Sequence, residues 1–331
     1  MKTPLALLAL LPLVSCSSNE VEIDPEKQLE LYMTTATYLY QDGSLIRAQD
    51  QAVKALEIEP DNRPMRRMVG WIRLRLGSTE DLLIAERFFQ DLFDDGDDDA
   101  PVLLGLATAQ ERLGQAHDEA SRAIASGERF TEHEDPERRA TELAQDARGY
   151  WQRSHENYER VLAGPTQIQK ALNGLLRVAA HLGDYEEALD WGRQLLETSH
   201  GEQLGWEATL RAEDLTQSEE DVARESIVSA VDLQIETHLF CTSILHRLGR
   251  TPEALEHVRD AVAIDPERAD AYGYRAQLFS ETGRFDAAIE DLDKFLRLSD
   301  KPFEHADIRK AYDLRAHCES QLAGATALSE G

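Results

Sequence analysis

Cysteine is scarce in this chain, and the cysteines present follow no metal-binding pattern. Only three occur in 331 residues, at Cys16, Cys241 and Cys318. A disulfide scaffold or a zinc finger needs more cysteines at closer spacing. The ten histidines form no His-x-x-x-His pair. We therefore expect no metal, no cofactor and no disulfide, and we expect Cys241 and Cys318 to be small buried hydrophobic residues.

Catalytic motifs are also missing. The sequence has no phosphate-binding glycine loop and no nucleophile elbow. Its many Asp and Glu residues are more typical of solvated helix faces than of a paired catalytic site. We therefore predict that the protein is not an enzyme.

Positively charged residues are far fewer than negatively charged ones. The chain has 35 Lys and Arg residues against 63 Asp and Glu, a formal net charge of −28. Nucleic acid is excluded as a partner, because phosphate binding requires clustered Lys and Arg. The densest acidic run, Asp94-Asp95-Gly96-Asp97-Asp98-Asp99, lacks the alternating ligand spacing of an EF-hand loop. We interpret it as a solvated loop rather than a calcium site.

Long apolar runs are absent apart from one near the start of the chain. Residues 4–14 are almost entirely apolar and follow a short basic start. This run is shorter than the roughly 18 residues that a membrane-spanning helix needs. The pattern is typical of a secretory signal peptide, which we assign to residues 1–15.

What the chain does have is a repeat, marked by glycine. The glycines recur at steps close to 34 residues, or about twice that between the fifth and the sixth. Such a period predicts stacked helix–turn–helix units, here seven to eight helix pairs, and so an all-α solenoid. The glycines of this series are Gly43, Gly77, Gly114, Gly149, Gly183, Gly249 and Gly283.

Each repeated residue type has a physical reason. A glycine can end a helix in the left-handed conformation, a small alanine five residues later allows close helix packing, and a proline stops the second helix. The series comprises Gly43, Ala48, Ala55 and Pro60, then Gly183 and Ala188, then Gly249, Ala254, Ala261 and Pro266, then Gly283 and Ala288.

These segments resemble the tetratricopeptide repeat family: "DGSLIRAQDQAVKALEIEPDN", "LGDYEEALDWGRQLLE", "LGRTPEALEHVRDAVAIDPERADAY" and "TGRFDAAIEDLDKFLRL". The resemblance implies a right-handed superhelical solenoid over residues 29–325, with a C-terminal capping helix over 307–322 and a frayed tail at 326–331. The clearest repeats are 29–62, 169–202, 235–268 and 269–302.

Two regions depart from the repeat. Residues 126–150 are polar and form a degenerate or inserted region, in which Pro136–Leu162 is either one long helix or part of a hairpin. Between Gly183 and Gly249 we expect a degenerate repeat, whose second helix begins with a capping box at Ser218.

The end of the leader is similar to the lipobox of bacterial lipoproteins. The residues Leu13-Val14-Ser15-Cys16 carry this resemblance, which implies that Cys16 is lipidated. Residues 16–28 would then be the lipidated cysteine and a flexible tether. The resemblance further implies an envelope protein, anchored by lipid alone to the outer membrane and facing the periplasm.

The tetratricopeptide resemblance also implies a binding groove, because the first helix of each repeat lines the concave surface in that family. An alternative stays open, in which the arginines pair with nearby carboxylates and Trp71 packs between helices. The implied groove residues are Arg67, Trp71 and Arg75, then Lys170, Asn173, Arg177 and His181, then His246 and Arg247 near Phe240.

Together these features predict a membrane-tethered scaffold or adaptor of the bacterial cell envelope. It would bind peptide or helical segments of other envelope proteins in the groove. The alternative is an assembly or pilotin-type lipoprotein that serves a pilus, secretion or outer-membrane complex. Lipoproteins of this kind have shorter repeat arrays, usually without a long central insertion. This difference disfavours the alternative.

Overall fold

The computed structural model describes residues 24–131, 133, 135–212 and 214–329. Every regular element in this part of the chain is an α-helix, which confirms the all-α prediction. The signal peptide assigned to 1–15 and the lipidation site Cys16 lie outside the described residues and stay predictions. In the described part, no helix is both long and apolar enough to cross a membrane.

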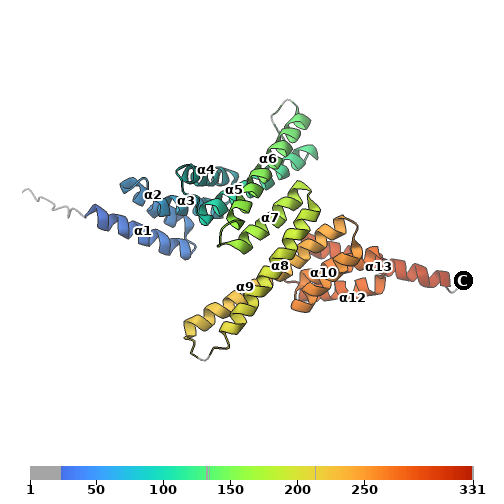
Figure 1. Ribbon diagram of the computed structural model, residues 1–331. Helices are drawn as coiled ribbons and strands as arrows, with labels where there is room; N and C mark the ends of the chain where they lie inside the picture. Colours follow the sequence, from blue (N-terminus) through green and yellow to red (C-terminus); the bar gives the residue numbers. More distant parts are fainter. Residues whose placement is uncertain (1–23, 132, 134, 213, 330–331) are drawn as a thin grey trace, which may run out of the picture. The chain divides into compact units, whose positions relative to one another are not determined.

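The chain divides into two compact units, the first ending at Ile72 and the second beginning at Arg73. In the described part of the first unit, α1 (Pro25–Gln41) and α2 (Leu45–Ile58) form a hairpin that is followed by the start of α3 (Arg63–Leu76) (Figure 1). Helix α1 begins inside the stretch 16–28 that we predicted to be a tether. It does so because the Asp24 side chain accepts a hydrogen bond from its first turn.

The second unit contains the end of α3 and the ten helices that follow it. Each helix from α4 onward packs on the next one along the chain, and α5 also contacts α7, α9 contacts α11 and α11 contacts α13. The helices are α4 (Thr79–Asp94), α5 (Ala100–Ala125), α6 (Pro136–Leu162), α7 (Ile168–Leu182), α8 (Tyr185–Thr209), α9 (Gln217–Arg247), α10 (Thr251–Ile264), α11 (Ala269–Glu281), α12 (Phe285–Leu298) and α13 (Ala306–Ser329).

Five glycines of the repeat series stand at helix ends with positive φ angles: Gly43, Gly77, Gly183, Gly249 and Gly283. A side chain at these angles would be strained, so the turn chemistry requires glycine there. The alanines of the following helices are completely buried, namely Ala48, Ala55, Ala188, Ala254, Ala261 and Ala288. Pro60 and Pro266 lie two residues beyond the ends of α2 and α10.

The glycine series is wrong at Gly114 and Gly149, which lie inside α5 and α6 rather than at turns. The turn between these helices instead uses Gly127, whose φ is +77°. Gly114 has a packing role, because a Cβ atom there would lie 2.4 Å from Nε1 of Trp151. The spacing of Gly114 coincides with the repeat period, but its function is close approach between helices.

Two hairpins are longer than the others. Helices α5 and α6 have 26 and 27 residues, and α8 and α9 have 25 and 31. Helix α5 packs on α6 and α8 packs on α9, and Figure 1 draws both pairs as long hairpins. Pro136–Leu162 is therefore one helix, and the degenerate repeat expected between Gly183 and Gly249 is absent. The structure describes thirteen helices, enough for six helix pairs and a last helix, and thus fewer than the seven to eight pairs predicted.

The capping box of α9 lies two residues before the predicted one. Thr216 Oγ1 accepts a hydrogen bond from the Glu219 backbone N at 3.4 Å, and the Thr216 backbone N donates to Glu219 Oε2 at 2.8 Å. Both Thr216 and Ser218 have an acidic residue three positions later, so the sequence pattern fits two starting points. The structure selects the earlier one.

The last helix, α13, covers the apolar face of the last hairpin. Ile308 and Ala311 pack into a cluster with Leu292 of α12, and Cys318 joins a second cluster with residues of α9 to α12. Cys241 and Cys318 are both buried and unbridged, as expected. Helix α13 continues past the predicted end at Leu322, so the tail assigned to 326–331 is helical as far as Ser329.

Candidate interaction groove

The first helices of the last repeats line a hollow in the second unit. Its volume is about 480 Å³, and α9, α11 and α13 supply its walls while Leu292 and Phe295 of α12 lie at its floor. Equivalent residues recur at 34-residue steps, since α9 contributes Phe240 where α11 contributes Tyr274. The same step relates Glu236 to Asp270, Leu239 to Gly273 and Ser243 to Gln277.

A second hollow of about 650 Å³ lies between α7 and α9. Helix α7 lines it with Gln169, Lys170 and Asn173. Glu236 lines both hollows, so the two hollows adjoin at this residue and are lined together by α7, α9, α11 and α13. We call this surface the interaction groove. The groove therefore runs across the first helices of four successive pairs, counting α13 as the first helix of an incomplete pair.

The interaction groove is close to electrically neutral although the chain is strongly acidic. Its lining includes five basic residues (Lys170, Arg224, Arg268, Lys301 and Lys310) and five acidic ones (Glu225, Asp232, Glu236, Asp270 and Asp307). The acidic surface elsewhere on the protein repels acidic segments. An uncharged or mixed-charge segment can bind in the groove without such electrostatic repulsion.

Charged side chains at one end of the groove are held by each other. Lys301 Nζ lies 2.9 Å from Asp307 Oδ2 and 3.2 Å from Asp270 Oδ1, which ties α11 to α13. The hydrogen bond to Asp307 raises the pKa of Lys301, and the same bond lowers the pKa of Asp307. Arg268 lies 3.5 Å from Glu236 of α9, the residue at which the two hollows meet. These pairs position the groove walls at that end and at the junction of the hollows.

Each of the two hollows presents an exposed apolar or aromatic group. Tyr274 is 41% exposed and Val228 is 60% exposed. Lys170 and Lys310 also line the groove, and Lys310 acts electrostatically on Asp307. Exposed aromatic rings in a concave surface are typical of protein-binding sites.

The predicted row on α7 separates into two pairs. Lys170 and Asn173 line the groove, whereas Arg177 and His181 turn towards α5 and α6. The Arg177 guanidinium bonds to the buried carboxylate of Glu111 at 2.6 and 2.9 Å. The His181 ring stacks on Trp151 with centroids 4.7 Å apart. Burial lowers the pKa of His181.

The remaining predicted residues lie outside the two hollows. His246 Nε2 is 2.6 Å from Glu281 Oε2, and Arg247 Nη1 donates to Tyr185 Oη at 2.8 Å, so both join neighbouring helices. Arg67, Trp71 and Arg75 share α3, with the first two in the first unit and Arg75 in the second. Their role in binding stays a prediction.

The sequence reasoning missed several groove residues: Tyr274, Gln277, Arg268, Lys301 and Lys310. Tyr274 had a usable signal, because it lies one repeat step after Phe240. The lysines had none, since they belong to the irregular loop before α13 and to α13 itself.

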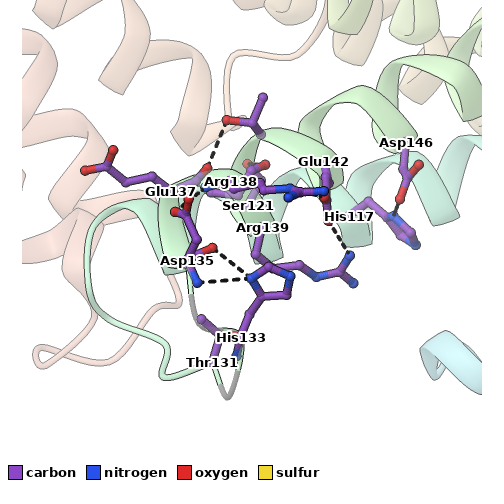
Figure 2. A network of polar contacts seen from close by, with 12 residues as sticks. His117, Ser121, Thr131, His133, Asp135, Glu137, Arg138, Arg139, Glu142 and Asp146 are labelled. Atoms are coloured by element: carbon purple, nitrogen blue, oxygen red, sulfur yellow. Dashed lines mark hydrogen bonds and ion pairs between the residues drawn. The ribbon is translucent and has the colours of Figure 1, made fainter.

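A second polar cluster lies at the turn between α5 and α6 and bonds mainly within itself (Figure 2). Asp135 Oδ1 accepts from the Arg138 backbone N at 3.0 Å, and the Asp135 backbone N donates to His133 Nδ1 at 3.2 Å. Ser121 Oγ donates to the Ala140 carbonyl at 2.6 Å, which holds α5 against α6. This cluster fixes the turn. Among the described residues, no group of three or more potential ligands could hold a metal ion.

Comparison with known proteins identifies the repeats. Residues 142–202 and 244–301 match the tetratricopeptide repeat family, and no curated protein matches the chain. The matched segments take in most of α6, all of α7 and α10 to α12, and parts of α8 and α9.

Several solved structures are similar to the chain at low identity. A tetratricopeptide repeat protein from Parabacteroides merdae is 13% identical with a TM-score of 0.39, covering 88% of this chain and 99% of that one. PilF of Pseudomonas aeruginosa is 12% identical with a TM-score of 0.38, covering 90% and 91%. The assembly chaperone of RpL4, Acl4, is 14% identical with a TM-score of 0.40, covering 93% and 100%. Similarities of this size do not bear on the function.

The family match and the helical hairpins agree over the same residues. Tetratricopeptide repeats stack into extended concave surfaces that bind other proteins. Residues 142–202 and 244–301 of this chain are therefore similar to tetratricopeptide repeats in sequence, and they fold as helical hairpins.

Proposed function

We propose that the protein is a membrane-tethered interaction scaffold of the bacterial cell envelope, which binds a peptide or helical segment of a partner in the interaction groove. The observation that carries this proposal is the pair of adjoining hollows, sharing Glu236, that α7, α9, α11 and α13 line. A linear segment can contact successive repeats through the same position in each, as Phe240 and Tyr274 illustrate.

The lining of the groove would suit a bulky apolar side chain of a partner. The hollow around Tyr274 combines buried Leu239, Leu292 and Phe295 with polar groups at both ends. A bulky apolar side chain would enter the middle, and the backbone of the segment would lie near Ser243 and Gln277. Burial of such an anchor contributes about 1.5–3 kcal/mol before the costs of association.

Tethering is proposed from the leader and from Cys16 rather than from the fold. Several acyl chains on Cys16, at about 0.8 kcal/mol per buried methylene, would hold the protein on the membrane. Partners that carry basic patches would be steered towards the acidic body, and more strongly at low ionic strength.

The test is capture of partners by the full-length protein in its own host. Wild type, Tyr274→Asp and Lys170→Glu are crosslinked in cells, purified, and compared by quantitative mass spectrometry. Tyr312→Asp is the matched control, because Tyr312 is 46% exposed but does not line the groove. We expect both groove variants to lose the main envelope partner at least about tenfold, as loss of an anchor residue does, and the control to retain it. Equal capture by all four proteins would contradict the proposal.

A further inference from the structure

A histidine pair joins α9 to α10 and has no role in the interaction groove. His238 Nδ1 and His257 Nδ1 lie 3.1 Å apart, and their rings are tilted by 55° with centroids 5.2 Å apart. Both side chains are partly buried. Two imidazole nitrogens of different helices are therefore close enough to share one ligand.

We propose that His238 and His257 bind one divalent transition-metal ion through their Nδ1 atoms and so clamp α9 to α10. The proposal does not depend on what the groove binds. Imidazole nitrogen is a ligand that Zn²⁺, Cu²⁺ and Ni²⁺ prefer over Mg²⁺ and Ca²⁺. These ions are the class that the pair selects.

The separation of the two nitrogens fits a shared ion. For an ion about 2.0–2.1 Å from each Nδ1, the N–metal–N angle would be about 95–102°, given the 3.1 Å separation of the two nitrogens. This angle suits neighbouring positions in tetrahedral, tetragonal or octahedral coordination. The rings must turn so that each Nδ1 lone pair leaves the line between the two nitrogens and meets an ion placed beside it.

The protonation state of the pair is also suitable. Burial, and then the neighbouring His257, lower the pKa of His238 to about 4. Burial lowers the pKa of His257 as well. In the absence of metal, one Nδ1 donates a hydrogen bond to the other. On metal binding, the proton of that Nδ1 is replaced and the ring takes its Nε2–H tautomer, so both Nδ1 lone pairs face the ion.

The surroundings favour a cation and leave room for its other ligands. Asp260 attracts positive charge at both rings, and Glu253 and Glu256 do so at His257. His257 also lines a hollow of about 410 Å³ between α8 and α10, which gives solvent a route to the pair. Because the described residues supply no cluster of three ligands, water completes the coordination.

The experiment is a titration of the purified full-length protein without a polyhistidine tag. Every protein carries Cys16→Ser, so that no free thiol of the leader binds metal. Zn²⁺ binding is measured by calorimetry, and Cu²⁺ binding by electron paramagnetic resonance, which reports coordinated nitrogens. The variants are His238→Ala and His257→Ala. The control is His246→Ala, which removes another imidazole of α9 that pairs with Glu281 instead.

We expect one ion per chain, two coordinated nitrogens and a higher melting temperature in the presence of Zn²⁺. Each single variant should lose at least about tenfold in metal affinity, because mutation of residues that only hydrogen-bond to metal ligands already costs about that much. His246→Ala should bind metal like wild type. Circular dichroism without metal checks that all variants fold. Absence of binding by wild type, or unchanged binding in either His238→Ala or His257→Ala, would overturn the proposal.

Discussion

Arg177 and Glu111 form a two-pronged ion pair between α7 and α5. Nε of Arg177 lies 2.6 Å from Oε1 of Glu111, and Nη2 lies 2.9 Å from Oε2. The Tyr158 hydroxyl donates to the same carboxylate at 2.7 Å, so a third helix joins the contact. Arg177 therefore holds helices together, although its spacing from Lys170 had suggested a place in the groove. Only Lys170 and Asn173 of that row face the groove.

The Glu111–Arg177 pair should contribute strongly to stability. The Glu111 side chain is 3% exposed, so Glu111→Gln leaves a partly buried guanidinium without its counter-charge. We expect a loss of about 2–3 kcal/mol in the free energy of unfolding, at the lower end for buried pairs because Arg177 is partly exposed. Urea unfolding measures it. Glu119→Gln, at an exposed position of the same helix, should change stability by less than about 0.5 kcal/mol. A similar small change for Glu111→Gln would show that the pair has no structural role.

Two glycines of the α5–α6 hairpin should change stability in opposite directions when replaced by alanine, because only Gly114 lies at a close contact between the helices. Gly114→Ala places a Cβ 2.4 Å from the Trp151 ring and should destabilise the protein by about 1–3 kcal/mol. Gly149→Ala meets only the end of Arg153, at 3.7 Å, and should stabilise α6 by about 0.5–1 kcal/mol. Thermal and urea unfolding of both variants give the comparison. If Gly114→Ala is as stable as wild type, the packing of α5 on α6 differs from that described.

His238 predicts a loss of stability in mild acid. Its pKa is about 4 in the folded chain, below the ordinary value of 6.5, mainly through burial. The unfolded chain therefore binds this proton more tightly, and the native state loses stability as pH falls through 6.5 and on towards 4. Between pH 7.5 and 5.5 this group should account for about 1 kcal/mol. Urea unfolding at the two pH values measures the loss.

The variant His238→Gln isolates this effect from other groups. It should reduce the pH dependence in that range by about 1 kcal/mol relative to wild type. His257, Asp260, Glu253 and Glu256 remain in place in the variant. An identical pH dependence in wild type and variant would mean that His238 titrates normally. The measurements are made with a chelator, so that metal ions do not contribute.

Membrane attachment should depend on Cys16. We expect Cys16→Ser to move the protein from the membrane fraction to the soluble fraction, because the thiol is where acyl chains would be attached. Fractionation followed by immunoblotting measures the distribution. Ser18→Ala should leave the protein in the membrane fraction. Retention of Cys16→Ser in membranes after an alkaline wash would contradict the lipid anchor.

The turns were the part of the fold that local sequence chemistry could predict. Gly43, Gly183 and Gly249 stand at helix ends with positive φ, and this requirement is set by the backbone alone. Gly114 has the same spacing but packs against Trp151, and no local signal distinguishes the two uses of glycine. The choice between one long helix and a hairpin likewise depends on tertiary packing, which is why α9 was misread as part of an extra repeat.

The repeat register could predict which helix positions line the groove, but not which individual side chains do so. The repeat step placed Phe240 on the concave side, and the same step leads to Tyr274. Arg177 shares a helix face with Lys170, and only the position of Glu111, 66 residues earlier, decides that it turns away. Contacts over that distance follow from the stacking of the helices rather than from any local pattern.

The most direct test of the scaffold account is site-specific photocrosslinking in cells, with a photoreactive phenylalanine analogue in place of Tyr274. The matched site is Tyr312, which is comparably exposed but outside the groove. The account predicts that the Tyr274 site crosslinks to one envelope protein, that the Tyr312 site does not, and that Lys170→Glu removes the crosslink. Crosslinking to the same protein from both sites, or none from the Tyr274 site, would contradict the groove as the binding surface.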